Sequence, residues 1–426
     1  MTPTAVKKTS PNNKSVKTPP VHAPMTQFET RDEQLLVAGK TMAEIADQLG
    51  QTPFYVYDKS IINQSVKRLR LALPDDIHLH YAIKANPMSA VVNHLATLTD
   101  GLDVASAGEL SIALNSGIEP STISFAGPGK TDSELKKAIA TGVIINMESA
   151  TEMRRIDKIG RDFERKPRVS IRVNPDFELK TSGMKMSGGP KPFGIDAEVV
   201  PAVLDELKSL ALDFQGFHIF CGSQNLKADA IIEAQTNTFA LAEKLSRHWG
   251  EPIAWLNIGG GLGVPYFPGE ERIELDAIAE NLTRLLEQYH DSFADTEIVM
   301  ELGRYLVAEA GLYVSKVIDV KTSRGETFAI CDGGLHHHLA ASGNFGQVIR
   351  KNYPVAVANR MSSDVCAESV SIVGPLCTPL DILAHKMMLP RIQVDDYIAV
   401  YQSGAYGASA SPQGFLGHPS VKEVLL

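Results

Sequence analysis

The sequence predicts an α/β protein in which a (β/α)8 barrel is followed by a C-terminal β domain. Eight short, apolar, β-rich runs lie between residues 77 and 302, and stretches of helical period separate them. This alternation is typical of βα units that build a parallel sheet, and eight such units close into a barrel. After Arg304 the runs become shorter and are separated by turns, with little helical period, which favours a sandwich or an open barrel.

The predicted strands follow one another along the chain. They are IHLHYAIK at 77–84, GLDVAS at 101–106, TISFAG at 122–127, GVIINM at 142–147, RVSIRV at 168–173, FQGFHIF at 214–220, IAWLNIG at 253–259 and TEIVMEL at 296–302. Segments 107–116 and 227–246 are two of the predicted helices. The strand-like runs of the β domain are YLVAEAGLYVSKVIDVK at 305–321, ETFAICD at 326–332, SVSIVG at 369–374 and YIAVYQSG at 397–404.

Composition excludes several classes of protein. The chain has 426 residues with 41 Lys+Arg against 50 Asp+Glu, a net charge of −9, which argues against binding to nucleic acid or to an anionic membrane. Neither a membrane-spanning run nor a secretory segment is recognisable. The four cysteines lack disulfide or metal-ligand spacing, so we expect a cytoplasmic protein without a metal site.

The chain divides into four predicted parts. Residues 1–26 contain four lysines, five prolines and no acid, a composition that predicts a disordered tail. Residues 27–57 form an N-terminal segment that we expect to pack with the β domain. Residues 58–308 form the barrel and 309–426 the β domain.

The carboxyl ends of the predicted barrel strands bear polar or glycine-rich sequences, and active sites of such barrels lie at these ends. The strand-end residues are, in order, Lys84, Asp103, Gly127 to Gly129, Glu148, Arg172, then His218, Phe220 and Ser223, then Gly259 to Gly263, and finally Glu301 to Arg304. The loops after strands seven and eight are where such barrels commonly bind phosphate, so Gly260, Gly261 and Arg304 are candidates for a phosphate site. The alternative is that these glycines only allow the backbone to form a turn and bind no ligand.

Lys84 is the candidate reactive residue of this site. A lysine at the end of a buried strand is costly unless it is neutralised or covalently bound, so Lys84 is a candidate for a Schiff base, with a surface lysine as the alternative. A phosphate site beside such a lysine indicates pyridoxal 5'-phosphate (PLP). Glu301 would then face the pyridine nitrogen, and a salt bridge to Arg304 or to another base is the less favoured alternative for this glutamate.

Seven motifs in order resemble the fold-type III PLP decarboxylases, which include the diaminopimelate, ornithine and arginine decarboxylases. The motifs are YAIKANP (81–87), GLDVASAGEL (101–110), HIFCGSQ (218–224), NIGGGLG (257–263), ELGR (301–304), GPLC (374–377) and SGAYG (403–407). The resemblance covers roughly residues 50 to 415. It implies an alanine racemase-like barrel and a homodimer whose sites are shared across the interface.

The resemblance also implies roles for individual residues. Lys84 carries PLP and Glu301 is its pyridinium partner, while Asp103 and Arg172 tune the lysine and the ring edge. The phosphate clamp consists of Ser223, Gly260, Gly261, Gly303, Arg304 and Tyr406. Cys377, delivered by the partner subunit, protonates Cα after carbon dioxide leaves. The substrate contacts implied are Arg304, Cys377, Thr378, Asp381 and Tyr406.

The chain departs from the family pattern at the cofactor ring and near the substrate. Phe220 stands where an HxHxGSQ pattern has a ring-stacking histidine, and His218 on the same strand face is either a site residue or a core histidine. Thr378 replaces the acid that follows the cysteine in diaminopimelate and ornithine enzymes, which leaves only Asp381 nearby. The Arg-Pro and Tyr cluster that binds the distal carboxylate of diaminopimelate is replaced by LHHHLAASGNFGQ (335–347).

The departures indicate a divergent branch. SGMKMSGGPKPFG, HIFCGSQNL and DGGLHHHLAASGNFGQ are similar to the exosortase-associated PLP decarboxylases and to enzymes that act on carrier-linked or conjugated amino acids. We therefore expect decarboxylation of an amino acid or an amino-acid conjugate, with diaminopimelate as the alternative substrate. A racemase is disfavoured because that class has an arginine at the pyridine nitrogen, and a non-catalytic homologue is disfavoured by Lys84 and Cys377. His336, His337 and His338 are more plausible in a substrate loop than as metal ligands.

Overall fold

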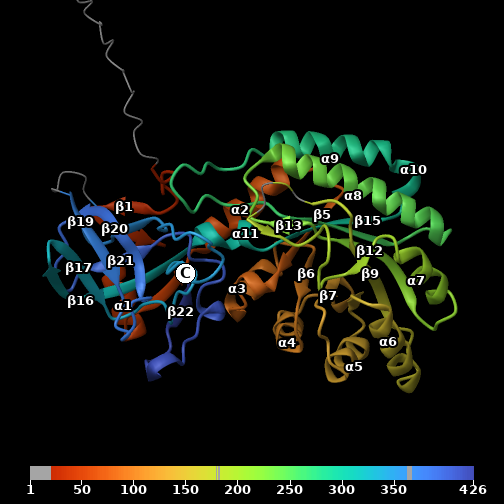
Figure 1. Ribbon diagram of the computed structural model, residues 1–426, viewed down its shortest axis with the longest axis horizontal. Helices are drawn as coiled ribbons and strands as arrows, with labels where there is room; N and C mark the ends of the chain where they lie inside the picture. Colours follow the sequence, from red (N-terminus) through yellow and green to blue (C-terminus); the bar gives the residue numbers. More distant parts are fainter. Residues whose placement is uncertain (1–20, 179, 181–182, 362–366) are drawn as a thin grey trace, which may run out of the picture.

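The protein is described here from a computed structural model, which describes residues 21–178, 180, 183–361 and 367–426. The greater part of the predicted disordered tail, residues 1–20, lies outside the described residues. The barrel occupies one side of the molecule and the β domain the other (Figure 1).

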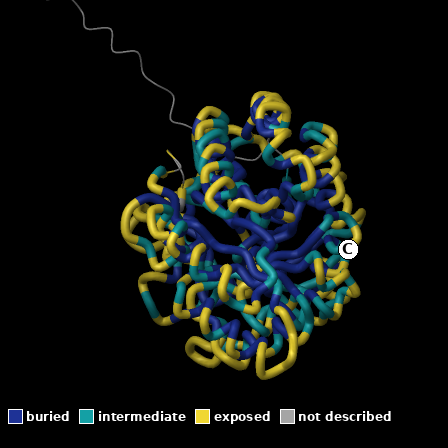
Figure 2. The backbone as a smooth tube through the Cα atoms, turned by 90° about the vertical axis from the view of Figure 1, so that its right-hand side faces the viewer, coloured by how far each residue is buried: buried dark blue, intermediate teal, exposed yellow. Residues whose placement is uncertain are grey.

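Eight parallel strands form a closed barrel, which confirms the predicted fold. They are β5 (Ile77–Ala82), β6 (Gly101–Val104), β7 (Ile123–Phe125), β8 (Ile144–Met147), β9 (Arg168–Asn174), β12 (Asp213–Ile219), β14 (Trp255–Gly260) and β15 (Glu297–Leu302). The ring closes because β15 pairs with β5 and β8 pairs with β9. Every predicted barrel run contains one of these strands, and the strands form the buried centre of the molecule in Figure 2. Short β11 (Ile195–Asp196) adds to the edge of β9.

Helices surround the barrel, and some of them begin and end at residues that favour helix termini. They are α2 (Lys59–Ala72), α3 (Ser89–Leu95), α4 (Ala107–Asn115), α5 (Asp132–Thr141), α6 (Ala150–Asp162), α7 (Val200–Leu207), α8 (Ala228–Trp249), α9 (Asp276–Gln288) and α10 (His290–Phe293). Thr131 and Glu134 form a capping box at the start of α5, and Gly142 ends the helix at φ 78°. Gly250 follows α8 in the same left-handed conformation. The helix therefore ends at Trp249, three residues beyond the predicted end at 246.

The β domain is one sheet built from both ends of the chain. Its strands are β4 (Phe54–Tyr57), β16 (Gly311–Ser323), β17 (Glu326–Cys331), β18 (Val355–Val357), β19 (Ala367–Val373), β20 (Ile382–Pro390), β21 (Tyr397–Val400) and β22 (Lys422–Leu425). The order is β18-β21-β16-β17-β19-β20, and β4 joins β16 to β22. A small N-terminal sheet lies against this domain, since Leu35 N donates to Ala358 O at 2.7 Å. It contains β1 (Glu29–Arg31), β2 (Gln34–Val37) and β3 (Lys40–Thr41), followed by α1 (Met42–Leu49).

One expectation about the domain junction is wrong. The run 305–321 was expected to be strand-like throughout, but Arg304–Val307 forms α11 and Ala308–Ala310 a 3-10 helix, so β16 begins only at Gly311. These residues are buried on all sides and therefore show no amphipathic period. Alanine, leucine and glutamate are good helix formers, and here their preference decides the local structure.

One hydrophobic core runs through both parts of the molecule. Buried side chains of the barrel and of the β domain, such as Tyr81 and Tyr313, belong to a single contiguous cluster. The junction between the two parts is therefore packed, which gives a rigid setting for residues contributed by both. Among the described residues no helix combines the length and the apolar character needed to cross a membrane.

Candidate active site

Lys84 lies at the carboxyl end of β5, inside a short 3-10 turn at Ile83–Ala85. Its side chain is 45% exposed, and its Nζ lies 3.5 Å from Glu301 Oε1 on the neighbouring strand β15. Nζ also lies 5.5 Å from the ring centroid of Phe220. The amine is thus accessible while it is paired with a carboxylate, and an aromatic face stands beside it.

Glu301 connects Lys84 to the barrel interior. Its other oxygen, Oε2, lies 3.1 Å from His218 Nε2, and both side chains are buried. Burial alone would raise the pKa of this carboxyl, but Lys84 and His218 hold it well below its usual range. The alternative of a salt bridge to Arg304 is not what this structure shows, because Arg304 Nη1 donates to Tyr266 Oη at 2.9 Å. His218, whose role the sequence left open, contacts Glu301, and its part in the site stays a prediction.

Asp103 on β6 and Arg172 on β9 each have partners of their own, and β7 and β8 lie between these two strands. Asp103 accepts a hydrogen bond from Ser124 and lies 3.3 Å from His80 Nδ1. Burial works against the charge on His80, yet Asp103 raises the pKa of that imidazole to about 9. Arg172 Nη1 donates to Glu148 Oε1 at 2.8 Å, and sequence reasoning had given Glu148 no role.

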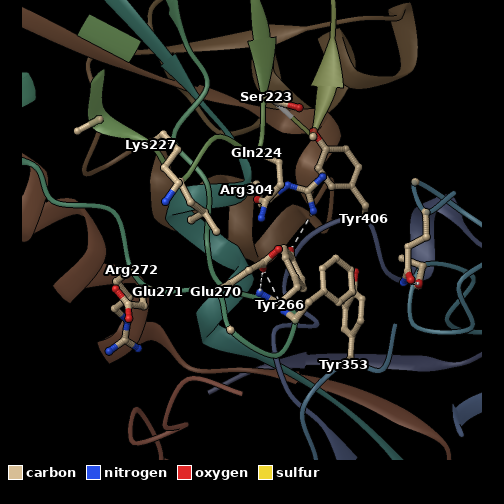
Figure 3. A pocket seen from close by; sticks show the side chains of 18 of the residues that line it. Ser223, Gln224, Lys227, Tyr266, Glu270, Glu271, Arg272, Arg304, Tyr353 and Tyr406 are labelled. Carbon is tan, nitrogen blue, oxygen red and sulfur yellow. Dashed lines mark hydrogen bonds between the residues drawn. The ribbon is translucent and has the colours of Figure 1, made fainter. Parts of the chain in front are cut away.

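The predicted phosphate clamp gathers around Arg304. Its guanidinium lies over the rings of Tyr406 at 4.6 Å and Tyr266 at 5.3 Å, and its buried Nε has no partner among the described residues. Ser223, on short strand β13 (Gly222–Ser223), lines the same cavity as Arg304 and Tyr406 (Figure 3). β13 pairs with β10 (Met184–Lys185).

The glycine-rich loop brings backbone close to this clamp. A Cβ at Gly260 would lie 2.1 Å from Glu301 O, and Gly261 has φ 84°, so the bends require residues without a side chain. A Cβ at Gly303 would lie 2.9 Å from the Cβ of Ala85.

These residues fit PLP. The accessible amine of Lys84 is a group that the aldehyde of PLP would bind, and the buried, ionised Glu301 is a group that would pair with a protonated pyridine nitrogen at the other end of the ring. The unpartnered Nε of Arg304, the hydroxyl of Ser223 and the glycine loop supply donors of the kind that bind phosphate.

Two aromatic residues near the clamp were missed by sequence reasoning. The rings of Tyr266 and Tyr353 contact each other in a tilted arrangement with centroids 4.7 Å apart, and both line the cavity beside Arg304. Tyr266 lies three residues beyond the GGGLG motif, and this position could have drawn attention to it. Tyr353 comes from the β domain and only the tertiary structure brings it here.

The segment that bears Cys377 lies in the β domain, just before β20. Cys377 is exposed on this chain. Asp381, three residues after Thr378, is buried, and its two oxygens accept hydrogen bonds from Leu335 N at 2.6 Å and Leu376 N at 2.8 Å. These two hydrogen bonds to Asp381 stabilise the loop that bears Cys377.

The histidine run His336 to His338 forms a turn rather than an extended segment. The amides of His337 and His338 both donate to Gly334 O, and the rings of His336 and His337 lie 3.7 Å apart. His338 turns elsewhere, with its Nε2 2.9 Å from Ser403 Oγ. In the part of the chain that the structure describes, no group of three or more His, Cys, Asp or Glu side chains is placed to bind a metal ion.

The barrel, Lys84 and the anion clamp define a PLP-dependent enzyme, and comparison with known proteins identifies its family. The family described as "Pyridoxal-dependent decarboxylase, pyridoxal binding domain" matches residues 59–308, and the chain belongs to this family. The L-glutamyl-[BtrI acyl-carrier protein] decarboxylase of Niallia circulans is 38% identical over 380 residues, covering 88% of this chain and 89% of that protein.

Two further relatives are diaminopimelate decarboxylases. The one from Aquifex aeolicus is 33% identical over 402 residues, covering 94% of this chain and 92% of its own. A crystal structure of the Helicobacter pylori enzyme complexed with L-lysine superposes with a TM-score of 0.79 at 29% identity, covering 90% of this chain and 94% of that one.

These findings confirm the predicted class. The chain is a PLP-dependent decarboxylase, a carboxy-lyase that acts on an amino acid or an amino-acid conjugate, and PLP is its cofactor. Its fold is that of the diaminopimelate decarboxylases. Membership of the exosortase-associated branch stays a prediction.

Proposed function

We propose that the protein decarboxylates an amino acid whose side chain is joined to a larger group, as in a carrier-linked conjugate, rather than free diaminopimelate. The observation that carries this proposal is the state of Asp381. It is the acid nearest to Cys377 in sequence, and both of its oxygens already accept backbone hydrogen bonds. It offers no free carboxylate to the distal ammonium group of diaminopimelate, and an unpaired buried ammonium is a large penalty.

The comparisons support a conjugated substrate. A relative of 38% identity is named for action on a glutamyl group held by an acyl-carrier protein. Thr378, uncharged, follows Cys377 and its hydroxyl lies 3.4 Å from Leu380 N. Both observations favour a substrate whose distal end is neutral.

We assign the chemistry to residues that the fold brings to the barrel mouth. PLP, when bound, supplies the electron sink that loss of carbon dioxide requires. Lys84 would hold the cofactor covalently, while Glu301, kept ionised by Lys84 and His218, would hold a proton on the ring nitrogen. Phe220 and His218 would pack against the ring. Asp103 and Arg172 would set the charge at its edge.

The remaining assignments concern the cofactor phosphate and the substrate. Ser223, Gly260, Gly261, Gly303, Arg304 and Tyr406 bind the phosphate. Arg304 and Tyr406 also face the substrate, and Cys377 with Thr378 contacts it from the partner subunit. Free thiols at Cys221, Cys331 and Cys377 are consistent with a reducing, cytoplasmic setting.

We propose that the active protein is a homodimer. Phe345, Val348, Ile349 and Leu380 are exposed, and Asn344 Nδ2 lies 3.4 Å from Leu380 O, so these apolar side chains belong to adjoining loops. Cys377 lies on the same loop as Leu380. An exposed apolar patch near an exposed thiol is what an interface that shares active sites requires.

The substrate proposal is tested by carbon dioxide release from PLP-loaded enzyme. The panel contains free amino acids, meso-diaminopimelate, and L-glutamate linked through its side chain to a holo acyl-carrier protein. We expect kcat/KM for the carrier-linked substrate to exceed that for diaminopimelate at least 100-fold, about 2.7 kcal/mol of transition-state binding.

A matched variant sharpens this test. Thr378→Glu restores a carboxylate after Cys377, and we expect it to improve turnover of diaminopimelate relative to the carrier-linked substrate. Efficient lysine formation by the unaltered enzyme, or rescue of a lysine auxotroph by it, would instead establish diaminopimelate as the substrate.

Cys377 is tested by its own substitution. We expect Cys377→Ala to keep bound cofactor but to slow turnover at least tenfold or to divert it to abnormal products, because the proton donor is lost. Mixing equal amounts of Cys377→Ala and Lys84→Ala should restore about one quarter of wild-type activity, since half of the dimers are mixed and each has one intact site. Wild-type rates and products for Cys377→Ala, or no recovery on mixing, would contradict the assignment.

A further inference from the structure

A large cavity extends from the phosphate clamp toward the surface between the barrel and the β domain. Its volume is about 740 Å³, within the range of cavities that bind drug-sized ligands. Ser223, Arg304 and Tyr406 line it, whereas Lys84, Phe220 and Glu301 are not among its lining residues. The cavity therefore begins where the cofactor phosphate would lie and continues away from the reacting lysine. A phosphate alone is too small to occupy it.

The cavity is enclosed by three separate parts of the chain. Residues 223–229 come from the loop before α8 and its first turn, residues 266–274 from the loop after β14, and residues 340–353 from the β domain. The third wall includes part of the segment that replaces the diaminopimelate-binding cluster of the family. Its cavity-lining members are Ala340, Phe345, Gly346 and Gln347, none of them charged.

The inner wall is aromatic and firmly held. Tyr266, Phe267 and Tyr353 form a cluster with ring centroids 4.7 to 6.0 Å apart. Glu270 accepts hydrogen bonds from the amides of Tyr266 at 2.9 Å and Phe267 at 3.0 Å, which fixes the loop. Figure 3 shows Tyr266, Tyr353 and Tyr406 around the guanidinium of Arg304. A preorganised wall of this kind binds without a large ordering cost.

The N-terminal segment ties two walls of the cavity together. Gly269 N donates to Val21 O at 2.8 Å, and His22 Nε2 lies 2.9 Å from Asn352 O. Gly269 lines the cavity and Asn352 adjoins Tyr353, which also lines it. The opening is thus fixed by three parts of the sequence that are far apart.

The charges at the cavity distinguish among possible ligands. Arg272 is paired with Glu309, and Arg304, whose hydrogen-bond partner Tyr266 is neutral, is assigned to the cofactor phosphate, whereas Lys227 has no ion-pair partner among the described residues. Asp229, Glu270, Glu271 and Glu274 also line the cavity. Within the described lining, one free cation among several carboxylates suits a ligand with a single phosphate and disfavours a polyanion.

We propose that this cavity binds the phosphopantetheine-type arm of a carrier-linked substrate. This inference rests on the function proposed above and deepens it. The arm is a flexible, amide-containing, uncharged chain that ends in one phosphate. The aromatic wall and Gln347 contact the chain, Lys227 meets the phosphate, and the amino acid passes Arg304 to reach Lys84. Coenzyme A shares the arm but carries further phosphates, so the acidic lining favours the carrier.

The direct test measures binding of 4'-phosphopantetheine, without any amino acid, to the PLP-loaded full-length enzyme by calorimetry. We expect saturable binding that Phe267→Ala weakens at least fivefold. Lys227→Glu should weaken 4'-phosphopantetheine at least fivefold and leave dephosphorylated pantetheine unchanged. The matched controls are Phe163→Ala and Lys244→Glu, at exposed positions outside the cavity, and both should bind as the wild type does. Absent binding, or equal binding by all variants, would overturn the proposal.

Steady-state kinetics with substrates that differ only in the group that carries the amino acid separates this inference from the proposed function. The best amino acid of the panel is presented on N-acetylcysteamine, on pantetheine, on the carrier protein and on coenzyme A. We expect kcat/KM to rise at least tenfold from the short thioester to pantetheine, through KM, and the rise to disappear in Phe267→Ala. Coenzyme A should be poorer than the carrier. Equal rates on every arm would reject the arm site and leave the conjugate function intact, whereas no turnover of any conjugate would reject the function itself.

Discussion

Lys84→Ala is expected to abolish carbon dioxide release, with a loss of at least a thousandfold, about 4 kcal/mol of barrier. The amine of Lys84 is the accessible nucleophile 3.5 Å from the ionised Glu301, and alanine leaves nothing there to bind the cofactor covalently. Borohydride reduction followed by peptide mass spectrometry should find cofactor on the Lys84 peptide of the wild type and none in the variant.

The control for this substitution is Lys67→Ala, at an exposed position of α2 on the outside of the barrel. It should retain wild-type turnover and labelling of Lys84. Measurable labelling at another lysine, with activity retained in Lys84→Ala, would mean that the site has been placed wrongly.

Glu301→Gln is expected to lower kcat at least 100-fold while the cofactor stays bound. Glutamine keeps the shape and one hydrogen bond to His218, but it has no charge to hold a proton on the ring nitrogen. In the cofactor-free enzyme the same substitution removes the ion pair with Lys84, so the pKa of the Lys84 amine, which burial lowers and Glu301 raises, should fall. The pH dependence of labelling of Lys84 by an amine-specific reagent in the cofactor-free enzyme measures this shift separately from turnover.

Glu297→Gln provides the matched control on the same strand. Glu297 is at the amino end of β15, where it pairs with His78 at 3.4 Å and lies 3.9 Å from His80, so it tests whether charge at this end of the strand affects turnover. We expect kcat within twofold of the wild type. If Glu301→Gln behaved in the same way, Glu301 would be a structural residue and the partner of the ring nitrogen would have to be sought elsewhere.

Much of the barrel was predictable because strands that are buried in a parallel barrel are apolar and β-branched, and because their carboxyl ends carry the polar residues. Lys84, Glu301 and Arg304 could be placed together from the strand order alone, since β5 and β15 are neighbours only if eight strands close. The start of the β domain could not be placed, because 304–310 is helical without being amphipathic.

The sequence by itself determined the barrel, the lysine, the glycine loops and the class of cofactor, since these depend on local periodicity and on motifs within single strand ends. Only the tertiary structure decided three sets of contacts. They are the contact between His218 and Glu301, the hydrogen bonds from backbone amides to Asp381, and the aromatic contact between Tyr266 and Tyr353. These depend on contacts between residues up to 87 positions apart, as for Tyr266 and Tyr353. The physical reason is that side-chain pairing across elements follows from how the barrel and the β domain pack, and no local pattern records that packing.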